Sequence, residues 1–347
     1  MAASGAAMCG ATLWEPPLGV PMPRAGPIRL LRRRARRALA RLREPEPPPA
    51  PFIVGVPRSG TTLLRLMLDA HPDLAIPPET HFLPKLIRLV QQAAEGEDAR
   101  ARALELITTH RRWPDFGLDA GELRDRFAGE GALRPGDAAR AFYEAYAAKH
   151  GKPRWGEKTP QYLKTLKRIA TALPEAHFIH IIRDGRDVAL SLLEVSWGPK
   201  TIDAAAVQWT TQIRRARRKA RSVPHYSEVR YEGLVADPEP IVRRVCSFCD
   251  LRFDPAMLDY HRTATERMEG LARDLELGGG RDAIGASERA RQHALVSEAP
   301  RGERAGRWRS EMEPRDVAAF EAIAGPTLAE LGYELVETPT RADTPTR

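Results

Sequence analysis

The stretch that decides the fold runs from Pro51 to Pro72 and reads PFIVGVPRSGTTLLRLMLDAHP. It begins with a short apolar run typical of a buried strand, passes through a turn bounded by Gly55 and Gly60, and enters a helix. Glycines at these positions let the backbone curl with its N–H groups facing inward, and the following helix adds its positive N-terminus. The pattern predicts a loop that binds a phosphate or sulfate group.

One residue separates this loop from a nucleotide-binding P-loop of the Walker type. A Walker loop carries a lysine followed by a hydroxyl residue that binds Mg²⁺. Here Thr61 takes the place of the lysine, and Thr62 keeps the hydroxyl. The cation of the loop is Arg58, whose planar guanidinium can bind an oxyanion through two hydrogen bonds. The missing lysine counts against a P-loop kinase, which stays open as an alternative.

The rest of the chain alternates strands and helices. AHFIHIIRDGRDVALSLL (176–193) reads as a second buried strand that turns into a helix, and YSEVRYEGL (226–234) as a third strand. GEKTP (156–160) reads as a loop entering a helix. We therefore predict an α/β protein with a P-loop-type three-layer fold, in which a central parallel sheet is flanked by helices. Ligands of such sheets bind beyond the carboxyl ends of the strands, which here carry PRSGTT, RDGRD and RYEGL.

The positive charge of the chain is concentrated near its start. The chain has 347 residues and a net charge of +8, and residues 29–43 hold eight arginines and no acid. The remaining charges balance, because 54 basic residues less these eight equal the 46 acidic ones. A Pro-rich linker, EPEPPPAP, follows. We predict a poorly ordered basic arm and linker at 1–49, a catalytic domain at 50–337 and a disordered tail at 338–347.

The basic arm has three interpretations. It is a solvated leader, an amphipathic helix that lies on an anionic membrane surface, or a nucleic-acid contact. The last is the least favoured, and we expect no nucleic-acid partner, because the chain lacks the interleaved aromatics that stack on single strands. No apolar run is long enough to span a membrane, and the start lacks a secretory pattern. We expect a cytoplasmic protein, with the arm as a candidate peripheral membrane contact.

The cysteines fit a reducing compartment. The chain has three, of which Cys246 and Cys249 form a CxxC pair in a helix-like stretch. A four-ligand zinc site would need a second pair. We therefore predict that both pack in the core.

A second anion site is predicted at the end of the second strand. Arg183 lies where the strand ends, and Ser191 follows it by two helical turns. A nucleotide with phosphates at both its 3′ and 5′ positions needs two such sites, whereas a kinase has little use for them.

At this point the sequence resembles the sulfotransferases that use 3′-phosphoadenosine 5′-phosphosulfate (PAPS), most of all the tyrosylprotein branch and its bacterial relatives. The resemblance covers about residues 50–337 and rests on VGVPRSGTTLLRLMLDAHPD, ETHFLP, GEKTP, IIRDGRDVALSLL, VRYEGLVADPE, GRWR and LAELGYE. It implies transfer of a sulfuryl group from PAPS to a hydroxyl without a metal. The residues that it implies for the 5′ end of the cofactor are Arg58, Ser59, Gly60, Thr61 and Thr62, and those for the 3′-phosphate are Arg183 and Ser191.

The resemblance also implies catalytic roles. Glu79 matches the family's general base, and its apolar neighbours predict a raised pKa; the alternative is an ordinary acid at a helix start. Lys158 matches a lysine that neutralises charge on the bridging oxygen, with Glu157 as a residue that orients it. Arg58 is assigned both binding and catalysis. His81 is a weaker candidate base, for which a structural role is favoured.

Later matches are Tyr231, near the cofactor, and Arg307 with Trp308, a pair that closes over the nucleotide unless the tryptophan is core. The tyrosylprotein enzymes have an arginine where this chain has Val195, and their late serine has no clear match, with Gln292 or His293 nearby. These departures weaken the case for peptide tyrosine. Carbohydrate, glycolipid, another small molecule and peptide tyrosine remain candidate acceptors, and a non-catalytic anion-binding module remains a rival. The high Ala, Arg and Pro content suggests a bacterial source.

Overall fold

The computed structural model describes residues 47–93, 98–129, 131–262, 275–277, 281–284 and 302–336. The chain divides into two compact units, Met1–Pro47 and Pro48–Arg347, and the description below concerns the second. The arm at 29–43, the tail at 338–347, and both Gln292 and His293 lie outside the described residues. Within the described part, no helix combines the length and the apolar character needed to cross a membrane.

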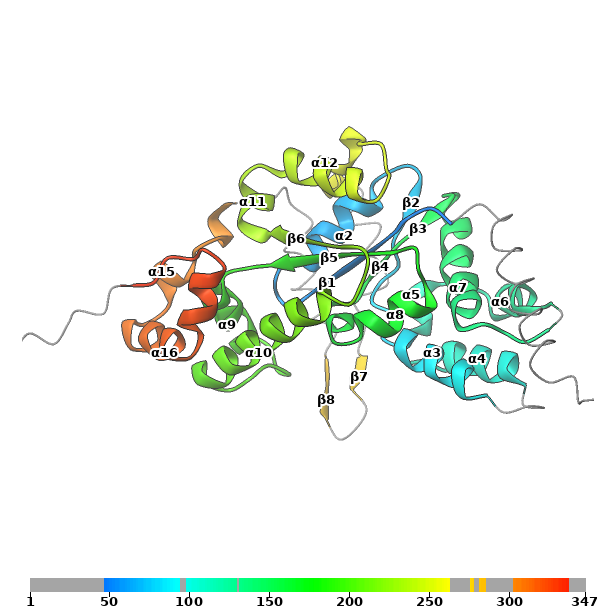
Figure 1. Cartoon of the computed structure of the whole chain (residues 1–347), viewed down its shortest axis with the longest axis horizontal. Coiled ribbons are helices and arrows are strands. Elements are labelled where there is room, and N and C mark those ends of the chain that lie inside the picture. Colours follow the sequence, from blue (N-terminus) through cyan, green and yellow to red (C-terminus); the bar gives the residue numbers. More distant parts are fainter. Residues whose placement is uncertain are drawn as a thin grey trace, which may run out of the picture. The chain divides into compact units, whose positions relative to one another are not determined.

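A four-stranded parallel sheet forms the centre of this unit (Figure 1). Its order is β4 (Glu157–Lys158), β1 (Ala50–Gly55), β5 (Ala176–Ile182) and β6 (Tyr226–Arg230). Three of these strands are those predicted from the sequence, and the flanking helices confirm the α/β three-layer fold. Because all four strands run the same way, the residues that follow them meet at one edge of the sheet.

The fourth strand was not predicted. GEKTP reads as a loop, yet Glu157 and Lys158 pair in parallel with Phe52 and Ile53 of β1. A Glu-Lys pair has no residue pattern typical of a strand. Only the pairing with β1 identifies this element. The consequence is functional, because neighbouring residues of a strand point to opposite faces of the sheet. Glu157 and Lys158 are thereby sent to different surroundings.

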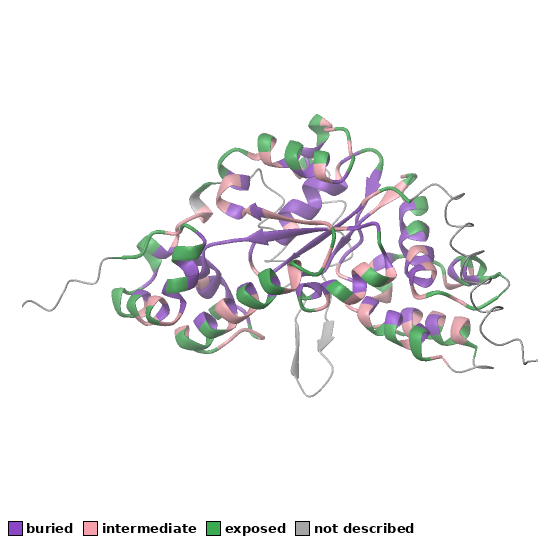
Figure 2. Cartoon of the chain, viewed as in Figure 1, coloured by how far each residue is buried: buried purple, intermediate pink, exposed green. Residues whose placement is uncertain are grey.

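Both faces of the sheet are buried, as Figure 2 shows for the central strands. Phe52 and Phe178 pack with helices of one layer, whereas Ile53 and Ile179, one residue along, pack with helices of the other. Helices of the first layer are α3 (Leu83–Gln92), α7 (Pro135–Lys149) and α8 (Leu166–Ala172). Helices of the second are α2 (Thr61–Asp69), α11 (Tyr231–Ala236) and α12 (Pro238–Phe248).

A third apolar cluster lies at the carboxyl end of β5, where Ile182 and Val56 pack with later helices. These are α9 (Gly185–Leu193), α10 (Ile202–Ala220), α15 (Trp308–Glu311) and α16 (Pro314–Glu330). The remaining elements are β2 (Leu74–Ala75), α4 (Ala99–Thr108), α5 (Trp113–Phe116), α6 (Ala120–Phe127), β3 (Arg154–Trp155), η1 (Pro160–Lys164), η2 (Pro255–Met257), β7 (Leu275–Leu277), β8 (Arg281–Ile284) and η3 (Gly302–Arg304). The sequence therefore folds around the predicted strands, and the late segment 302–336 returns to the end of β5.

The CxxC pair is confirmed as core packing. Cys246 and Cys249 are buried in the layer of α12, and the Cys246 thiol lies 3.6 Å from the sulfur of Met257. Burial raises the pKa of the Cys246 thiol to about 11 and that of Cys249 to about 12. Both thiols therefore stay protonated and apolar in character at neutral pH.

Candidate active site

The loop after β1 has the backbone of an anion-binding turn. The amide of Ser59 donates to the carbonyl of Val56 at 3.2 Å, and Arg58 and Gly60 both adopt positive φ, 71° and 93°. A positive φ is unusual for arginine and is typical of functional loops. Helix α2 then begins at Thr61, and no side chain caps its N-terminus. Its first N–H groups and its dipole thus favour an anion in the loop.

Two further features of the loop fit an anionic ligand. The Ser59 hydroxyl is buried and has no hydrogen-bond partner among the described residues, a situation that costs free energy unless a ligand supplies one. At Gly60 an added Cβ would lie 2.3 Å from Cδ2 of Tyr231, so only glycine admits this ring against the loop. Tyr231 is therefore placed beside the loop, as the resemblance implied, by the turn from β6 into α11.

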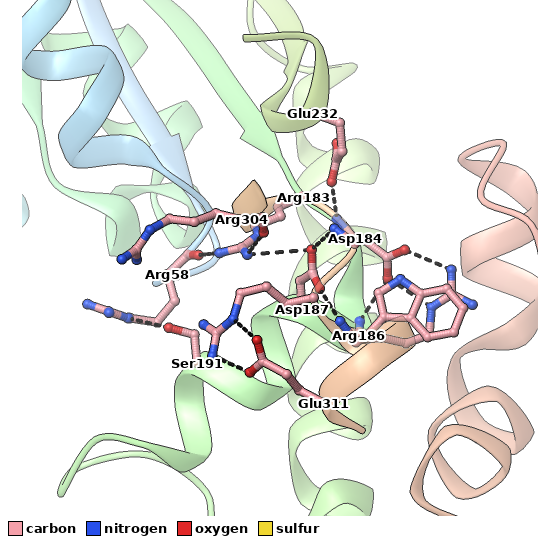
Figure 3. Close-up of polar contacts among 12 residues, drawn as sticks. Arg58, Arg183, Asp184, Arg186, Asp187, Ser191, Glu232, Arg304 and Glu311 are labelled. Carbon is pink, nitrogen blue, oxygen red and sulfur yellow. Dashed lines mark hydrogen bonds and ion pairs between the residues drawn. The ribbon is translucent and has the colours of Figure 1, made fainter. Parts of the chain in front are cut away.

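The loop meets the end of β5 in a group of side chains that we call the arginine cluster: Arg58, Arg183, Asp187 and Ser191 (Figure 3). Nε of Arg58 donates to Oγ of Ser191 at 2.9 Å, and Nη1 of Arg183 donates to the carbonyl of Arg58 at 3.2 Å. Arg183 also lies 3.4 Å from the Asp187 carboxylate, and its buried Nε has no hydrogen-bond partner in the part of the chain that the structure describes. Two loops that are 125 residues apart in sequence thus form one cationic site.

The late segment is attached to this cluster through Asp187. Its carboxylate accepts hydrogen bonds from the amides of Gly306 at 2.8 Å and Trp308 at 2.9 Å, while Nη2 of Arg183 donates to the carbonyl of Arg304 at 2.6 Å. Sequence reasoning missed Asp187, although the second acid of RDGRD is the signal that could have found it. The buried carboxylate fixes the segment 304–308 over the arginines.

The two residues of GRWR differ in their surroundings. Trp308 is 5% exposed, and Cζ of Arg186 lies 3.5 Å from the centre of the Trp308 ring. The tryptophan therefore belongs to the core. Arg307 donates to Glu311 at 2.6 Å and to Glu194 at 2.9 Å. Its role at the nucleotide stays a prediction, which requires it to leave these acids.

On the other side of the loop lies a second group, the acid–lysine cluster: Glu79, His81, Arg112 and Lys158. Nζ of Lys158 lies 2.8 Å from Oε1 of Glu79 and 3.4 Å from the Thr62 hydroxyl at the start of α2. Oε2 of Glu79 lies 2.8 Å from Nε2 of His81 and 3.7 Å from Arg112. The predicted base and the predicted lysine therefore meet beside the phosphate loop.

The direction of the Glu79 pKa differs from the sequence-based expectation. Burial alone would raise it, but Lys158, His81 and Arg112 together hold the pKa of this carboxyl well below its usual range. Burial in turn lowers the pKa of His81 and of Lys158, and their contacts with Glu79 oppose that shift. The apolar neighbours of Glu79 are visible in the sequence. Lys158 and Arg112, in contrast, come from distant segments of the chain. Glu79 is therefore an ionised carboxylate at neutral pH.

Among the described residues, the Glu157 carboxylate forms no hydrogen bond or ion pair with Lys158, so it does not orient that lysine by the direct contact that we expected. The two residues lie on opposite faces of β4, and the Glu157 carboxylate instead accepts hydrogen bonds from Tyr143, Thr80 and Thr159. Burial, only partly offset by these hydrogen bonds, raises the pKa of Glu157 to about 7. Sequence reasoning missed Thr80, Tyr143 and Arg112, since none stands in a motif for this chemistry.

Among the described residues, no group of three His, Cys, Asp or Glu side chains is arranged to hold a metal ion. The site in view is built from a loop of backbone amides, two arginines, a lysine and a carboxylate. Such a set binds oxyanions and can accept a proton from a hydroxyl.

Comparison with known proteins agrees with this chemistry. Residues 49–255 match the model of the sulfotransferase family, and the chain belongs to that family. It is 31% identical over 219 residues to a putative protein-tyrosine sulfotransferase of Caenorhabditis briggsae, covering 60% of this chain and 68% of that protein. It is 29% identical to protein-tyrosine sulfotransferase 1 of Danio rerio, covering 82% and 72%. The protein is thus an enzyme that transfers sulfuryl groups.

Solved structures show the same fold. The sulfotransferase domain of the olefin synthase from Synechococcus PCC 7002 is 25% identical and superposes with a TM-score of 0.57, over 85% of this chain and 98% of that domain. The sulfotransferase domain of the curacin biosynthetic pathway superposes with a TM-score of 0.52 at 20% identity, over 84% of this chain and 100% of that domain. Sulfotransferase domains from different biosynthetic systems share this scaffold, so the fold alone does not name the acceptor.

Proposed function

We propose that this sulfotransferase uses PAPS as its donor and a hydroxyl group as its acceptor, by direct in-line transfer without a metal. The main support is that Lys158 contacts both Glu79 and Thr62. These contacts place a lysine and an ionised carboxylate beside the phosphate loop. The arginine cluster on the other side supplies the second anion site that a 3′,5′-substituted nucleotide requires. When bound, PAPS would supply the sulfuryl group and a phosphate leaving group.

The fit of the donor rests on groups of this chain. Arg58 and Ser59 with the amides of Gly60, Thr61 and Thr62 would hold the 5′ end, and the unpaired Ser59 hydroxyl gains a partner there. Arg183 and Ser191 would hold the 3′-phosphate, which would satisfy the buried Nε of Arg183. Each of these orphaned polar atoms is a reason to expect an anion at the site.

Glu79 would accept the proton of the attacking hydroxyl. Its carboxylate is ionised, but Lys158, Arg112 and the hydrogen bond with His81 lower its pKa and make it a weak base as long as they bind it. Loss of the Lys158 contact would remove the nearest positive charge and raise the pKa of Glu79. If Lys158 moves from Glu79 towards negative charge near Thr62, it can stabilise that charge. The same move makes Glu79 a stronger base.

The acceptor is proposed by class. Peptide tyrosine is the first candidate, because two of the relatives named above carry that activity in their names. Carbohydrate, glycolipid and other small hydroxyl compounds are the others. Val195, buried here where the tyrosylprotein enzymes have arginine, is a specific reason to test them in parallel.

The test is transfer of ³⁵S from labelled PAPS to a tyrosine peptide, an oligosaccharide, a glycolipid and a simple phenol. We expect label in at least one acceptor without added metal, and none with Glu79→Gln. Phosphoryl transfer from ATP with Mg²⁺ in place of sulfuryl transfer would establish a kinase. Tight binding of PAPS with no turnover on any acceptor class would favour the non-catalytic module.

We also propose a cytoplasmic enzyme that reaches membrane-bound acceptors through the arm at 29–43. The support is the sequence of the arm, in which eight arginines occur without an acid. Deletion of residues 1–45 should weaken binding to phosphatidylserine vesicles while leaving transfer to a soluble acceptor intact. Unchanged vesicle binding after the deletion would reject this role.

A further inference from the structure

A buried carboxylate that the proposed mechanism does not use lies directly behind the acid–lysine cluster. Glu157 is 1% exposed, and it forms a hub with Thr80, Tyr143, Thr159 and Tyr162. Oε2 accepts from the Tyr143 hydroxyl at 2.6 Å and from Thr80 at 3.1 Å, and Oε1 accepts from Thr159 at 2.5 Å. We call these five residues the Glu157 hub.

The hub has one consistent direction of hydrogen bonding. The amide of Leu83 donates to the Tyr162 hydroxyl at 3.1 Å, and Tyr162 lies 2.6 Å from the Thr80 hydroxyl, which donates to Glu157. The amide of Thr80 donates to the Thr159 hydroxyl at 3.1 Å, which also donates to Glu157. Both relays begin at a backbone amide of the segment 80–83 and end on the same carboxylate. Above its pKa of about 7 the Glu157 carboxylate is ionised and only accepts hydrogen bonds, and it then sets the direction of both relays.

The hub connects the two partners of the acid–lysine cluster. Thr80 follows Glu79 in the chain, and Lys158 lies between Glu157 and Thr159. The hub thus joins the residues next to Glu79 and Lys158 in the chain. Nζ of Lys158 and Oε1 of Glu79 lie 2.8 Å apart. The segment also needs such support, since His81 holds a positive φ of 55°, which is strained for a residue with a side chain.

We propose that Glu157 is a positioning residue, whose carboxylate holds segment 79–83 against segment 157–159 and so sets the Glu79–Lys158 contact. This inference rests on the proposed function for its catalytic consequence, but its structural part does not. Replacing the carboxylate with an amide leaves the volume nearly unchanged. It also introduces N–H donors where Thr159 already donates, so buried donors lose their acceptor.

The test compares Glu157→Gln with Glu175→Gln by hydrogen exchange of single amides. Glu175 is a matched control, because it is also a buried carboxylate, but it lies before the start of the interior strand β5 and binds Arg140. In Glu157→Gln we expect the amides of Thr80 and Leu83 to exchange about tenfold faster or more. In Glu175→Gln both amides should exchange as in the wild type.

The kinetic readout separates positioning from binding. We expect Glu157→Gln to lower kcat by about 10- to 100-fold, because a small misplacement of reacting groups is enough for such a loss. The KM for PAPS should stay within about threefold, since none of the hydrogen bonds described for the hub goes to the phosphate loop. Glu175→Gln should change neither constant.

Thr159→Val gives a second, isosteric test should the glutamine variant fold poorly. It removes the hydroxyl between the Thr80 amide and Glu157 but leaves the relay through Tyr162. The Thr80 amide should exchange faster and the Leu83 amide should not. Wild-type exchange at Thr80 in both variants, or wild-type kcat in Glu157→Gln, would overturn the positioning role. If the wild type transfers no sulfuryl group, the proposed function fails, and the exchange data alone decide on the hub.

Discussion

The arginine cluster and the acid–lysine cluster lie on two sides of the same phosphate loop, yet their charges are partnered differently. In the acid–lysine cluster, the Glu79 carboxylate is bound by a lysine and an arginine, which are charged, and by a histidine whose pKa is lowered. In the arginine cluster, Arg183 pairs with the Asp187 carboxylate, and the arginines also donate to a serine hydroxyl and to the backbone carbonyls of residues 58 and 304. The neutral acceptors orient the guanidiniums without adding negative charge.

From this difference we infer that the arginine cluster binds the nucleotide and that the acid–lysine cluster takes part in the reaction. Guanidiniums that donate to backbone carbonyls are held in place for an anion. A carboxylate that shares cations is held ionised, and its basicity changes when one cation moves. We therefore expect substitutions in the acid–lysine cluster to affect turnover, and those in the arginine cluster to affect nucleotide affinity.

Among substitutions of the basic residues, the largest effect is expected from Lys158→Ala. Removal of a cation that stabilises developing charge should lower kcat by about 10³-fold, and the affinity for adenosine 3′,5′-bisphosphate should change little. Steady-state sulfuryl transfer and calorimetric titration measure the two quantities. Lys167→Ala, at an exposed position of α8, is the control. An equal loss of affinity would merge the two clusters into a single binding site.

The second prediction concerns pH and the support behind the acid–lysine cluster. The folded-state pKa of Glu157, about 7, lies above its ordinary value of 4.5, so the folded state keeps this proton when the unfolded state has lost it. The stability from this group is present below about pH 4.5 and is lost as pH rises towards 7, by about 3 kcal/mol. Lys158, Tyr143 and Tyr162 are the titratable groups around it.

Urea unfolding of the wild type and of Glu157→Gln between pH 4 and about 8 measures this contribution. The wild type should lose stability relative to the variant across that window, because glutamine does not titrate. Parallel curves would mean that Glu157 ionises as readily as an exposed acid, and the buried hub would then carry no electrostatic strain.

A smaller effect is expected from Arg183→Ala in the arginine cluster. Loss of a charged hydrogen-bonding group should weaken the binding of adenosine 3′,5′-bisphosphate by about 2 kcal/mol, or about 30-fold in affinity. Adenosine 5′-monophosphate, which lacks the 3′-phosphate, should bind wild type and variant with similar affinity. Arg217→Ala, whose exposed side chain pairs with Glu228, is the matched control. If the affinities for both nucleotides fall by the same factor, Arg183 supports the phosphate loop rather than binding the 3′-phosphate.

The smallest effect is expected from Arg307→Ala. Its guanidinium is bound by Glu194 and Glu311, and surface ion pairs of this kind contribute at most about 1 kcal/mol. The affinity for adenosine 3′,5′-bisphosphate should therefore fall by less than about fivefold. A loss as large as that of Arg183→Ala would show that Arg307 leaves its acids for the nucleotide, which would enlarge the arginine cluster.

The sequence by itself determined the parts that are local in the chain. The strand, glycine-bounded loop and helix at 51–72 follow from hydrophobic pattern and glycine spacing, and the positions of Arg183 after β5 and of Ser191 within α9 follow from the strand-to-helix pattern at 176–193. Three strands of the sheet and the packing of Cys246 were equally visible. In each case the signal lies within about twenty neighbouring residues, where backbone preferences decide.

Only the tertiary structure decided the electrostatics. The strand β4 exists because β1 pairs with it, and its pleat sends Lys158 to the site and Glu157 to a buried hub. The pKa of Glu79 falls because Lys158 and Arg112 arrive from distant segments, although its apolar neighbours alone predict a rise. Burial and the distances between charges depend on which segments meet, and segments far apart in a chain leave no periodic signal of their meeting.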